Sequence, residues 1–221
     1  MGRPREHDPE AVLDHARRLW VEGGPAGVTI RALAAESGVS NGAIYHAFGS
    51  RDGLLARVWG REAQRFLELQ RAAVNAVLDG GGPVEDAVVA AALAPTAYAE
   101  HDEPGARLLL TTTGDELADR DLAPPERGEL RRLRRELTGL VTDLSNRQWG
   151  RTDRAALATM RCCVVDLPGA LLLAPARLTD PVAQHALELA VRGILGEPPP
   201  QAESAAANDG VTGSDGSSAA W

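Results

Sequence analysis

Residues 29–51 combine small, polar and aromatic side chains in a pattern suited to binding nucleic acid. Thr29 and Ser40 each stand directly before a run of residues with helical periodicity. The first turn of a helix carries unpaired N–H groups and the positive end of the helix dipole, and both favour a phosphate. A hydroxyl at either position also caps its helix, so simple capping is the alternative to a phosphate contact.

The residues that follow Ser40 suit the edges of DNA bases. Asn41, Gly42 and Ala43 form the first turn of the second of these helices. An Asn side chain pairs with adenine, and an Ala methyl group contacts the methyl group of thymine. Gly42 allows backbone and DNA to approach closely, although it can equally be a turn residue. The pattern predicts a base-reading helix that begins at Asn41.

Three more side chains extend this candidate surface. Tyr45 lies beside the apolar pair Ile44 and Phe48, so it is either exposed and in contact with DNA or partly buried by packing. Arg51 begins the next predicted helix, where its guanidinium should reach a phosphate. His46 has no second ligand at a metal-binding spacing. We therefore expect no metal, no cofactor and no catalytic residue.

Four predicted helices position these residues, at about 9–22, 30–37, 41–48 and 51–79. Asp8 followed by Pro9 is a typical start for the first helix. The second and third helices are short, and a tight turn at Gly38 joins them. This layout predicts a helix-turn-helix, whose second helix enters the major groove of DNA.

The stretch TIRALAAESGVSNGAIYHAF, residues 29–48, closely resembles the DNA-binding domain of the TetR family of regulators. The shared features are a Thr-initiated helix, a Gly-Val-Ser turn, a Gly two residues after the Ser, a Tyr-His-x-Phe ending and a following Ser-Arg-x-x-Leu-Leu. The resemblance covers residues 6–66. It implies that Thr29, Tyr45 and His46 contact DNA phosphates. Asn41 departs from the Lys that is common in the family, and this removes one phosphate-neutralising charge.

Longer helices are predicted after the break at residues 80–83, at about 84–100, 105–117, 125–149, 152–174 and 181–195. A bend is expected at Pro168-Gly169, because proline removes a helical hydrogen bond. We therefore expect an all-α protein of about nine helices. It has a three-helix DNA-binding domain at 6–66 (motif 29–48), a larger helical domain at 67–196 and a disordered, Pro- and Ser-rich tail at 197–221.

Charge and composition limit the function further. The 221 residues carry a formal net charge of −8, which argues weakly against nucleic acid as a partner. Residues 1–66 carry nine Arg against eight acidic residues, however, so the head has a net charge of +1 and the remainder −9. The adjacent Cys162 and Cys163 make no disulfide framework. Without a leader peptide or an apolar run near ~18 residues, we expect a cytoplasmic protein and no membrane.

The resemblance also implies partners for the C-terminal part. The last two long helices of two copies would pack together into a homodimer, which suits DNA reading because paired recognition helices then lie about 34 Å apart. A small-molecule effector, of unknown identity, would bind between these helices and the head. Polar candidates for lining its pocket, each of which can instead be a surface or capped group, are Tyr98, Arg107, Thr111, Thr112, Thr113, Arg161 and Asp166.

The sequence therefore predicts a transcriptional regulator, and not an enzyme, since it has no Gly-rich phosphate loop, nucleophile elbow or metal cluster. The expected activity is that of a repressor that an effector releases from double-stranded operator DNA. The alternative is an effector-independent regulator that responds to a protein partner. Arg3 and Arg5 either enter the minor groove or form a disordered terminus. The arginines of 131–135 either bind nucleic acid or form a solvated face paired with Glu126, Glu129 and Glu136.

Overall fold

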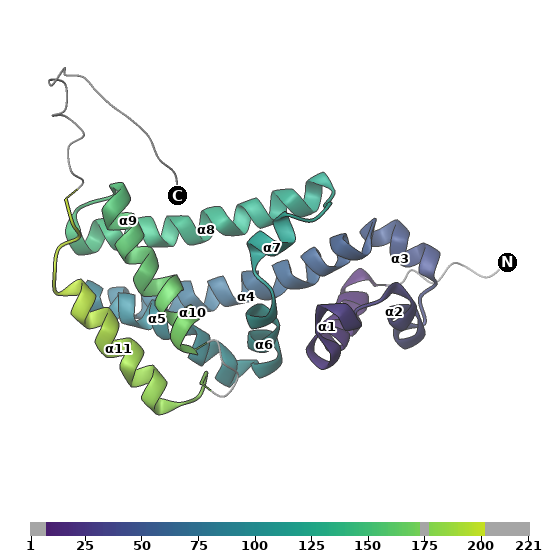
Figure 1. The fold of residues 1–221 in the computed structure, drawn as a ribbon, viewed down its shortest axis with the longest axis horizontal. Helices are drawn as coiled ribbons and strands as arrows, with labels where there is room; N and C mark the ends of the chain where they lie inside the picture. Colours follow the sequence, from purple (N-terminus) through teal and green to yellow (C-terminus); the bar gives the residue numbers. More distant parts are fainter. Residues whose placement is uncertain (1–7, 173–176, 202–221) are drawn as a thin grey trace, which may run out of the picture.

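The computed structural model describes residues 8–172 and 177–201 of the chain, and all regular elements within these ranges are helices (Figure 1). The expected all-α class is confirmed. Arg3 and Arg5 lie outside the described residues, as do positions 202–221 of the predicted tail. The helices form a small N-terminal head and a larger body, with one long helix running through both (Figure 1).

The head consists of α1 (Pro9–Gly27), α2 (Ile30–Ser37) and α3 (Asn41–Phe48), followed by the start of α4. Asp8 caps α1 by accepting from the amide of Glu10. The helical path of α1 is broken at Gly24, where φ is 65°, so the sequence-based end of this helix is close to the observed break. Each head helix begins at the capping residue that the sequence indicates.

Glycine allows the sharp turns on both sides of α3. Gly38 ends α2 with φ of 70°, and Gly49 ends α3 with φ of 69°. Side chains with a Cβ atom rarely adopt these left-handed values. The two glycines therefore fix how α3 is held between α2 and α4.

Helix α4 (Arg51–Asp79) is 29 residues long and turns back at Gly80–Pro83 into α5 (Val84–His101). Its capping residue is Ser50, whose hydroxyl accepts from the amide of Gly53 at 2.9 Å. Its first half packs in the head and its second half in the body. Because α4 is continuous, no structural break falls at residue 66, where the sequence analysis divides the domains.

Proline inside α5 leaves a carbonyl that another helix satisfies. Pro95 has no N–H to donate to the carbonyl of Ala91, one helical turn earlier. The side-chain amide of the buried Gln70 on α4 donates to that carbonyl at 2.9 Å. The proline in α5 and the polar residue in the core of α4 are thus parts of one arrangement.

Two of the predicted body helices are interrupted. The helix expected at 105–117 is divided into α6 (Glu103–Thr111) and α7 (Gly114–Ala118), because Thr112 is extended and Thr113 forms a capping box with Glu116. α8 (Pro124–Trp149) is as expected.

The helix expected at 152–174 is the second predicted body helix that the structure shows to be interrupted. Its described part consists of α9 (Arg154–Arg161), a π-helical segment at Cys162–Asp166 and α10 (Leu167–Leu172). The amide of Leu167 donates to the carbonyl of Cys162, which widens the turn just before Pro168. The distortion expected at Pro168 thus lies one turn earlier. Cys162 and Cys163 are both free thiols.

The last helix, α11 (Pro181–Leu195), begins at Asp180 and is followed by a docked segment. Pro199 is buried, and the guanidinium of Arg151 donates to the carbonyls of Pro199 at 2.7 Å and Pro200 at 3.1 Å. The structure thus differs from the tail predicted from residue 197, because Arg151 holds Pro199 and Pro200 at the α8–α9 turn.

The buried apolar side chains form two large clusters and one small one. One large cluster fills the body between α4, α5, α8, α9–α10 and α11. The other fills the head, and it also includes four leucines from α6, α7, α8 and the α7–α8 connection, namely Leu108, Leu117, Leu122 and Leu130. The head and the body therefore share a core.

One stretch, Arg154–Leu172, is long and apolar enough to cross a membrane by length and composition alone. It has a mean hydropathy of 1.5, and 33% of it is buried within the chain. This stretch is the helix α9 to α10 with its π-helical segment, which packs on α5 and α8 of the body.

Candidate DNA-binding surface

The residues predicted to bind DNA lie at the starts of α2, α3 and α4, except for Tyr45 and His46, which lie in the second half of α3. Within this set, Ala43 and Arg51 are half-buried. The exposed members are Thr29, Ser40, Asn41, Gly42, Tyr45 and His46. The helix-turn-helix thus presents two exposed groups, Ser40–Gly42 and Tyr45–His46, which the half-buried Ala43 and the buried Ile44 separate.

The two hydroxyl residues act as caps. Thr29 Oγ1 accepts from the amide of Ala32 at 3.0 Å, and Ser40 Oγ accepts from the amide of Ala43 at 3.3 Å. A hydroxyl that accepts a hydrogen bond still has its own hydrogen to donate. Capping therefore holds each side chain at the helix start and leaves it able to donate to a phosphate oxygen.

Gly42 has no role in the fold that requires glycine. It lies inside α3 and is not among the glycines with positive φ, so it is not the turn residue that the sequence allowed. A Cβ atom added at this position would meet nothing within 4 Å. Glycine in a helix costs about 0.5–1 kcal/mol relative to alanine. A bare backbone at this position thus has no explanation within the chain itself.

Tyr45 is 52% exposed, whereas its neighbours Ile44 and Phe48 are 1% and 3% exposed. The apolar pair anchors α3 to the head, and the Tyr45 ring projects away from the core. This exposure favours the exposed Tyr45 over the partly buried alternative. Its contact with DNA stays a prediction.

Arg51 has a partner that the sequence analysis did not anticipate. Its Nε donates to the carbonyl of Val28 at 2.7 Å, and its Nη2 donates to the carbonyl of Pro25. Both carbonyls belong to the end of α1, where carbonyl groups lack helical partners. The guanidinium thus links α1 to α4, and the predicted phosphate contact of Arg51 stays a prediction that must be compatible with these bonds.

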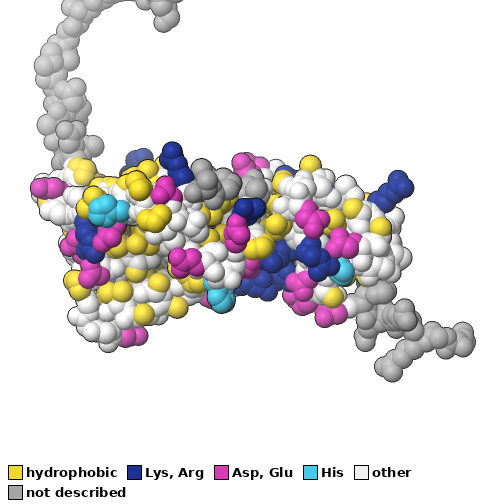
Figure 2. Space-filling model, turned by 90° about the horizontal axis from the view of Figure 1, so that it is seen from below, with side chains coloured by type: hydrophobic (Ala, Val, Ile, Leu, Met, Phe, Trp, Pro, Cys, Tyr) yellow, Lys and Arg dark blue, Asp and Glu magenta, His cyan; other side chains and the backbone are white. Residues whose placement is uncertain are grey.

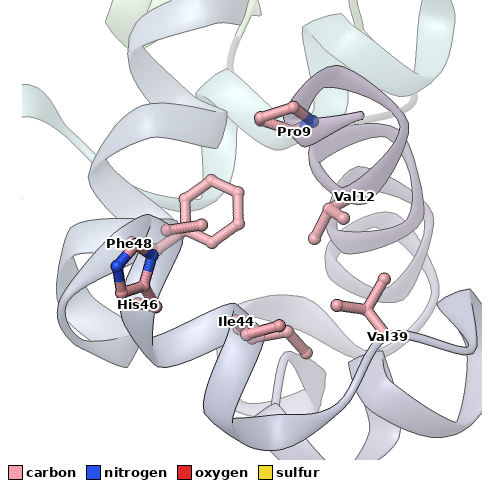
Figure 3. A pocket seen from close by; sticks show the side chains of 8 residues that line it. Pro9, Val12, Val39, Ile44, His46 and Phe48 are labelled. Carbon is pink, nitrogen blue, oxygen red and sulfur yellow. The ribbon is translucent and has the colours of Figure 1, made fainter. Parts of the chain in front are cut away.

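His46 borders an apolar groove of about 300 Å³ between α3 and the start of α1 (Figure 3). Pro9 and Val12 line it from α1, and Val39, Ile44 and Phe48 line it from the turn and α3. In residues 8–172 and 177–201, no three His, Cys, Asp or Glu side chains are grouped so that they could hold a metal ion. Apart from His46, the side chains that line the groove are apolar.

Acidic groups near this surface are paired. Glu36 at the end of α2 lies 2.9 Å from Arg18 and 3.2 Å from His15. Partial burial would raise the pKa of Glu36, but the hydrogen bonds from His15 and Arg18 outweigh this and lower it. Asp52 at the start of α4 receives a 2.7 Å hydrogen bond from Arg120. Two carboxylates that would repel DNA are thus compensated despite the acidic total charge.

The arginine-rich run on α8 favours the solvated-face interpretation. Arg132 bonds to Glu129 at 2.5 Å and also pairs with Glu136, and Arg134 pairs with Asp115. Glu126 departs from the expected pattern, because it is buried and accepts from Arg57 of α4. Arg132 and Arg134 are thus engaged with carboxylates of the same chain.

Several polar groups proposed to line an effector pocket have partners within the chain. Tyr98 is buried and donates to Glu62 at 3.1 Å. Thr113 caps α7, and the exposed pairs Arg107–Glu103 and Arg161–Asp166 lie at 2.8 and 3.7 Å. The side chain of Thr111 lies outside the described part of the structure.

Glu62 and its arginine partners were not predicted from the sequence. The signal that could have identified Glu62 is an acidic residue within the apolar stripe of α4.

Comparison with known proteins supports the resemblance seen in the sequence. Residues 12–58 match the family model described as bacterial regulatory proteins, tetR family. The transcriptional repressor AcnR of Corynebacterium glutamicum is 37% identical over 60 residues, which are 27% of this chain and 32% of AcnR. The repressor Rv3405c of Mycobacterium tuberculosis is 35% identical over 89 residues, 38% of this chain and 47% of Rv3405c. The matches thus span less than half of either relative.

Solved structures share the fold over most of the chain. The regulator PfmR of Thermus thermophilus aligns with a TM-score of 0.59 at 19% identity, covering 84% of this chain and 97% of PfmR. FadR of Bacillus subtilis, in complex with stearoyl-CoA, aligns with a TM-score of 0.59 at 13% identity, covering 85% and 97%. The ketosteroid regulator KstR2 of Mycobacterium tuberculosis gives 0.56 at 18% identity, covering 85% and 92%. The N-terminal helix-turn-helix of this chain thus matches the tetR family of bacterial regulatory proteins, and the chain as a whole shares the all-helical fold of these solved regulators.

Proposed function

We propose that this protein is a sequence-specific transcriptional regulator that reads double-stranded operator DNA with α3. The observation that carries the proposal is the first turn of α3. It presents Asn41, a bare backbone at Gly42 and Ala43 beyond a capping Ser40, while Ile44 and Phe48 anchor the opposite side in the core. An Asn amide and an Ala methyl are suited to base edges in the major groove. Tyr45, His46 and Thr29 would contact the flanking phosphates.

The protein is proposed to act as a homodimer through α9–α10 and α11. Val182 and Leu189 on α11 are 75% and 57% exposed. With the exposed His185, Ala186 and Gly193, they form one stripe at helical spacing, and hydrophobic side chains gather over this end of the body (Figure 2). Only 33% of the neighbouring apolar stretch Arg154–Leu172 is buried within a single chain. A second copy would cover both surfaces.

Repression and release by an effector are the regulatory mode that we propose. The relatives AcnR and Rv3405c are named repressors, and the structural neighbour FadR is described in complex with stearoyl-CoA. By this analogy, a small molecule bound in the body would shift the two heads and weaken operator binding in the bacterial cytoplasm. An effector-independent regulator that answers to a protein partner is the second candidate.

The test begins with selection of bound sequences from a random pool of double-stranded DNA. We expect one motif with two-fold symmetry to be enriched, because a two-fold dimer reads two half-sites. Tyr45→Ala combined with His46→Ala should then reduce affinity for that motif at least about tenfold, a loss of about 1.4 kcal/mol. Fluorescence anisotropy measures the affinity, and light scattering confirms an unchanged mass.

His101→Ala provides a matched control, because His101 is an exposed histidine at the end of α5 in the body. This variant should bind the selected motif like the unaltered protein. A pool with no enriched motif would refute DNA reading by this protein. Unaltered affinity of the Tyr45 and His46 variant would instead refute the assignment of α3 as the reading helix.

A further inference from the structure

A cluster of charged side chains lies where the head meets the body. Glu62 on α4 is fully buried, although it carries a carboxylate. Its Oε1 lies 3.2 Å from Nε of Arg17 on α1 and 3.0 Å from Nη1 of Arg65. Arg17 also donates to Asp102, which stands between α5 and α6, at 2.5 Å. Arg17 thus reaches from the head to two carboxylates of different helices.

Figure 2 shows dark-blue side chains gathered in the middle of the molecule, between the body and the head. The side chains of Arg17 and Asp102 are mostly covered, at 20% and 24% exposed. Charges this far removed from water attract one another strongly, but desolvation cancels much of the gain. Such a cluster therefore contributes less to net stability than to fixing one arrangement of the helices that carry it.

The backbone around the cluster is shaped to admit Arg17. At Gly105 in the first turn of α6, an added Cβ atom would lie 2.7 Å from Glu62 Oε2 and 2.9 Å from Arg17 Nη2. The amide of Gly105 donates to Asp102 at 3.0 Å. α6 therefore begins directly against the ion pairs, and a side chain at position 105 would displace the charged ends of these side chains.

The cluster also continues into the core of the body. The hydroxyl of the buried Tyr98 on α5 donates to Glu62 Oε2 at 3.1 Å. The Tyr98 ring packs edge-on against Phe66, with ring centroids 5.7 Å apart. A displacement of α5 in the body would thus act on the carboxylate that holds Arg17.

We propose that Arg17 is a positioning residue for DNA reading, which fixes the head against the body through Glu62 and Asp102 and transmits movements of Tyr98 to it. The part that concerns DNA rests on the function proposed above. The bonds of Arg17 hold one head orientation in each subunit, so the two reading helices of a dimer keep the spacing that the operator needs. When the bonds are lost, the shared core and α4 alone hold the head, which then samples a wider range of orientations, so that only a fraction of dimers remain competent to bind.

The cluster is expected to stay closed across the neutral pH range. Burial would raise the pKa of Asp102, but the hydrogen bonds from Arg17 and Gly105 outweigh this and lower it. A carboxylate whose pKa is lowered by folding stabilises the fold above its ordinary pKa, and this contribution is lost as the pH falls through the lowered value. Physiological changes of pH would therefore leave the Arg17 bonds intact.

The experiment measures head position and DNA affinity in the full chain. Spin labels are placed at the exposed positions Ala35→Cys on α2 and Asn146→Cys on α8, after Cys162→Ser and Cys163→Ala. Labelled chains are diluted with unlabelled ones, so that the distance within one subunit is read. We expect a narrow distance distribution, which Arg17→Met broadens while weakening binding to the selected operator about tenfold.

Arg107→Met is the matched control, because Arg107 on α6 forms an exposed pair with Glu103 on the same helix. It should change neither the distribution nor the affinity. Arg17→Lys keeps the charge but not the planar fork that serves two carboxylates, so it should fold and still broaden the distribution. Circular dichroism at the measuring temperature will show whether Arg17→Met is folded. If it is not, Arg17→Lys is used in its place.

The outcomes separate the two proposals. A folded Arg17→Lys or Arg17→Met protein with the distance distribution of the unaltered chain would overturn the positioning role. A broadened distribution without weaker operator binding would also overturn it. If the unaltered protein selects no DNA motif, the proposed function fails, whereas the distance measurement alone still decides whether Arg17 fixes the head.

Discussion

Gly42 allows the demands of folding and of DNA reading to be separated at a single residue. Its Cβ position is open and its backbone is helical, so Gly42→Ala should raise the free energy of unfolding by up to about 0.5–1 kcal/mol. The added methyl would occupy the space that the proposed DNA contact needs. We therefore expect operator affinity to fall about tenfold in the same variant, or about 1.4 kcal/mol.

Gly139→Ala on α8 is the matched control, because Gly139 is also helical and its added Cβ would meet nothing within 4 Å. It should gain stability like Gly42→Ala and bind the operator normally. Thermal unfolding followed by circular dichroism and anisotropy titrations measure the two effects. If Gly42→Ala bound the operator as tightly as Gly139→Ala does, close approach of DNA at Gly42 would be ruled out.

The caps of the head could be predicted from sequence because they depend on neighbours in the chain. Thr29, Ser40 and Ser50 each accept from an amide three residues ahead, and a local pattern identifies such residues. The bonds of Arg51 could not be predicted in this way. Its acceptors lie 23 and 26 residues earlier, and only the folded arrangement of α1 and α4 brings them together.

At the scale of elements, Gln70 and Pro95 form a pair whose effects on stability should not add. Gln70→Met leaves the buried carbonyl of Ala91 without a donor, at a cost of about 1–3 kcal/mol. In a Pro95→Ala background, the amide of residue 95 can donate to that carbonyl instead. The loss caused by Gln70→Met should therefore be smaller there, by about 1 kcal/mol or more.

A double-mutant cycle on the free energy of unfolding in urea measures this coupling. Thr138→Ala, which removes a side-chain hydrogen bond on the exposed face of α8, is a suitable control in the same two backgrounds. It should cost the same with Pro95 and with Ala at that position. An equal cost of Gln70→Met in both backgrounds would show that the two residues are independent.

The positions of long helices followed from periodicity, whereas their interruptions and the docked segment did not. The start of α7 depends on a capping box at Thr113, which a continuous helical pattern conceals. Residues 197–201 have the composition of a disordered tail. Proline carbonyls are nevertheless good acceptors, and Arg151, 48 residues before Pro199, supplies the donors. Contacts at such separations leave no local signal in the sequence.

For the whole molecule, the exposed stripe on α11 is expected to hold two copies together. Val182→Ser combined with Leu189→Ser removes the two most exposed large aliphatic side chains among the described residues. The protein should then sediment as a monomer, and its affinity for a two-half-site operator should fall at least about tenfold, because one head binds alone. Analytical ultracentrifugation and anisotropy follow the two quantities.

The same type of change at Ala72 and Ala76, which are exposed on α4, serves as the control and should leave the dimer intact. A dimer that persists in the Val182 and Leu189 variant would place the interface elsewhere.

Sequence patterns indicated a head and a body, but not how far their cores merge. Leu108 and Leu130 pack with Leu54 and Val58 because the fold of α6–α8 carries them beside α4, although they are distant along the chain.

The shared core also limits how this regulator can be rearranged by engineering. A designer who joins its head to a foreign sensor at residue 66 would cut through α4 and leave Leu108, Leu117, Leu122 and Leu130 behind. The transplanted head would then expose the hollow that these leucines fill, and it would tend to aggregate or unfold. The exchangeable unit is the head together with a body surface that supplies equivalent apolar side chains. Chimeras should therefore be chosen first by matching that body surface, and the crossover point within the chain should be chosen afterwards.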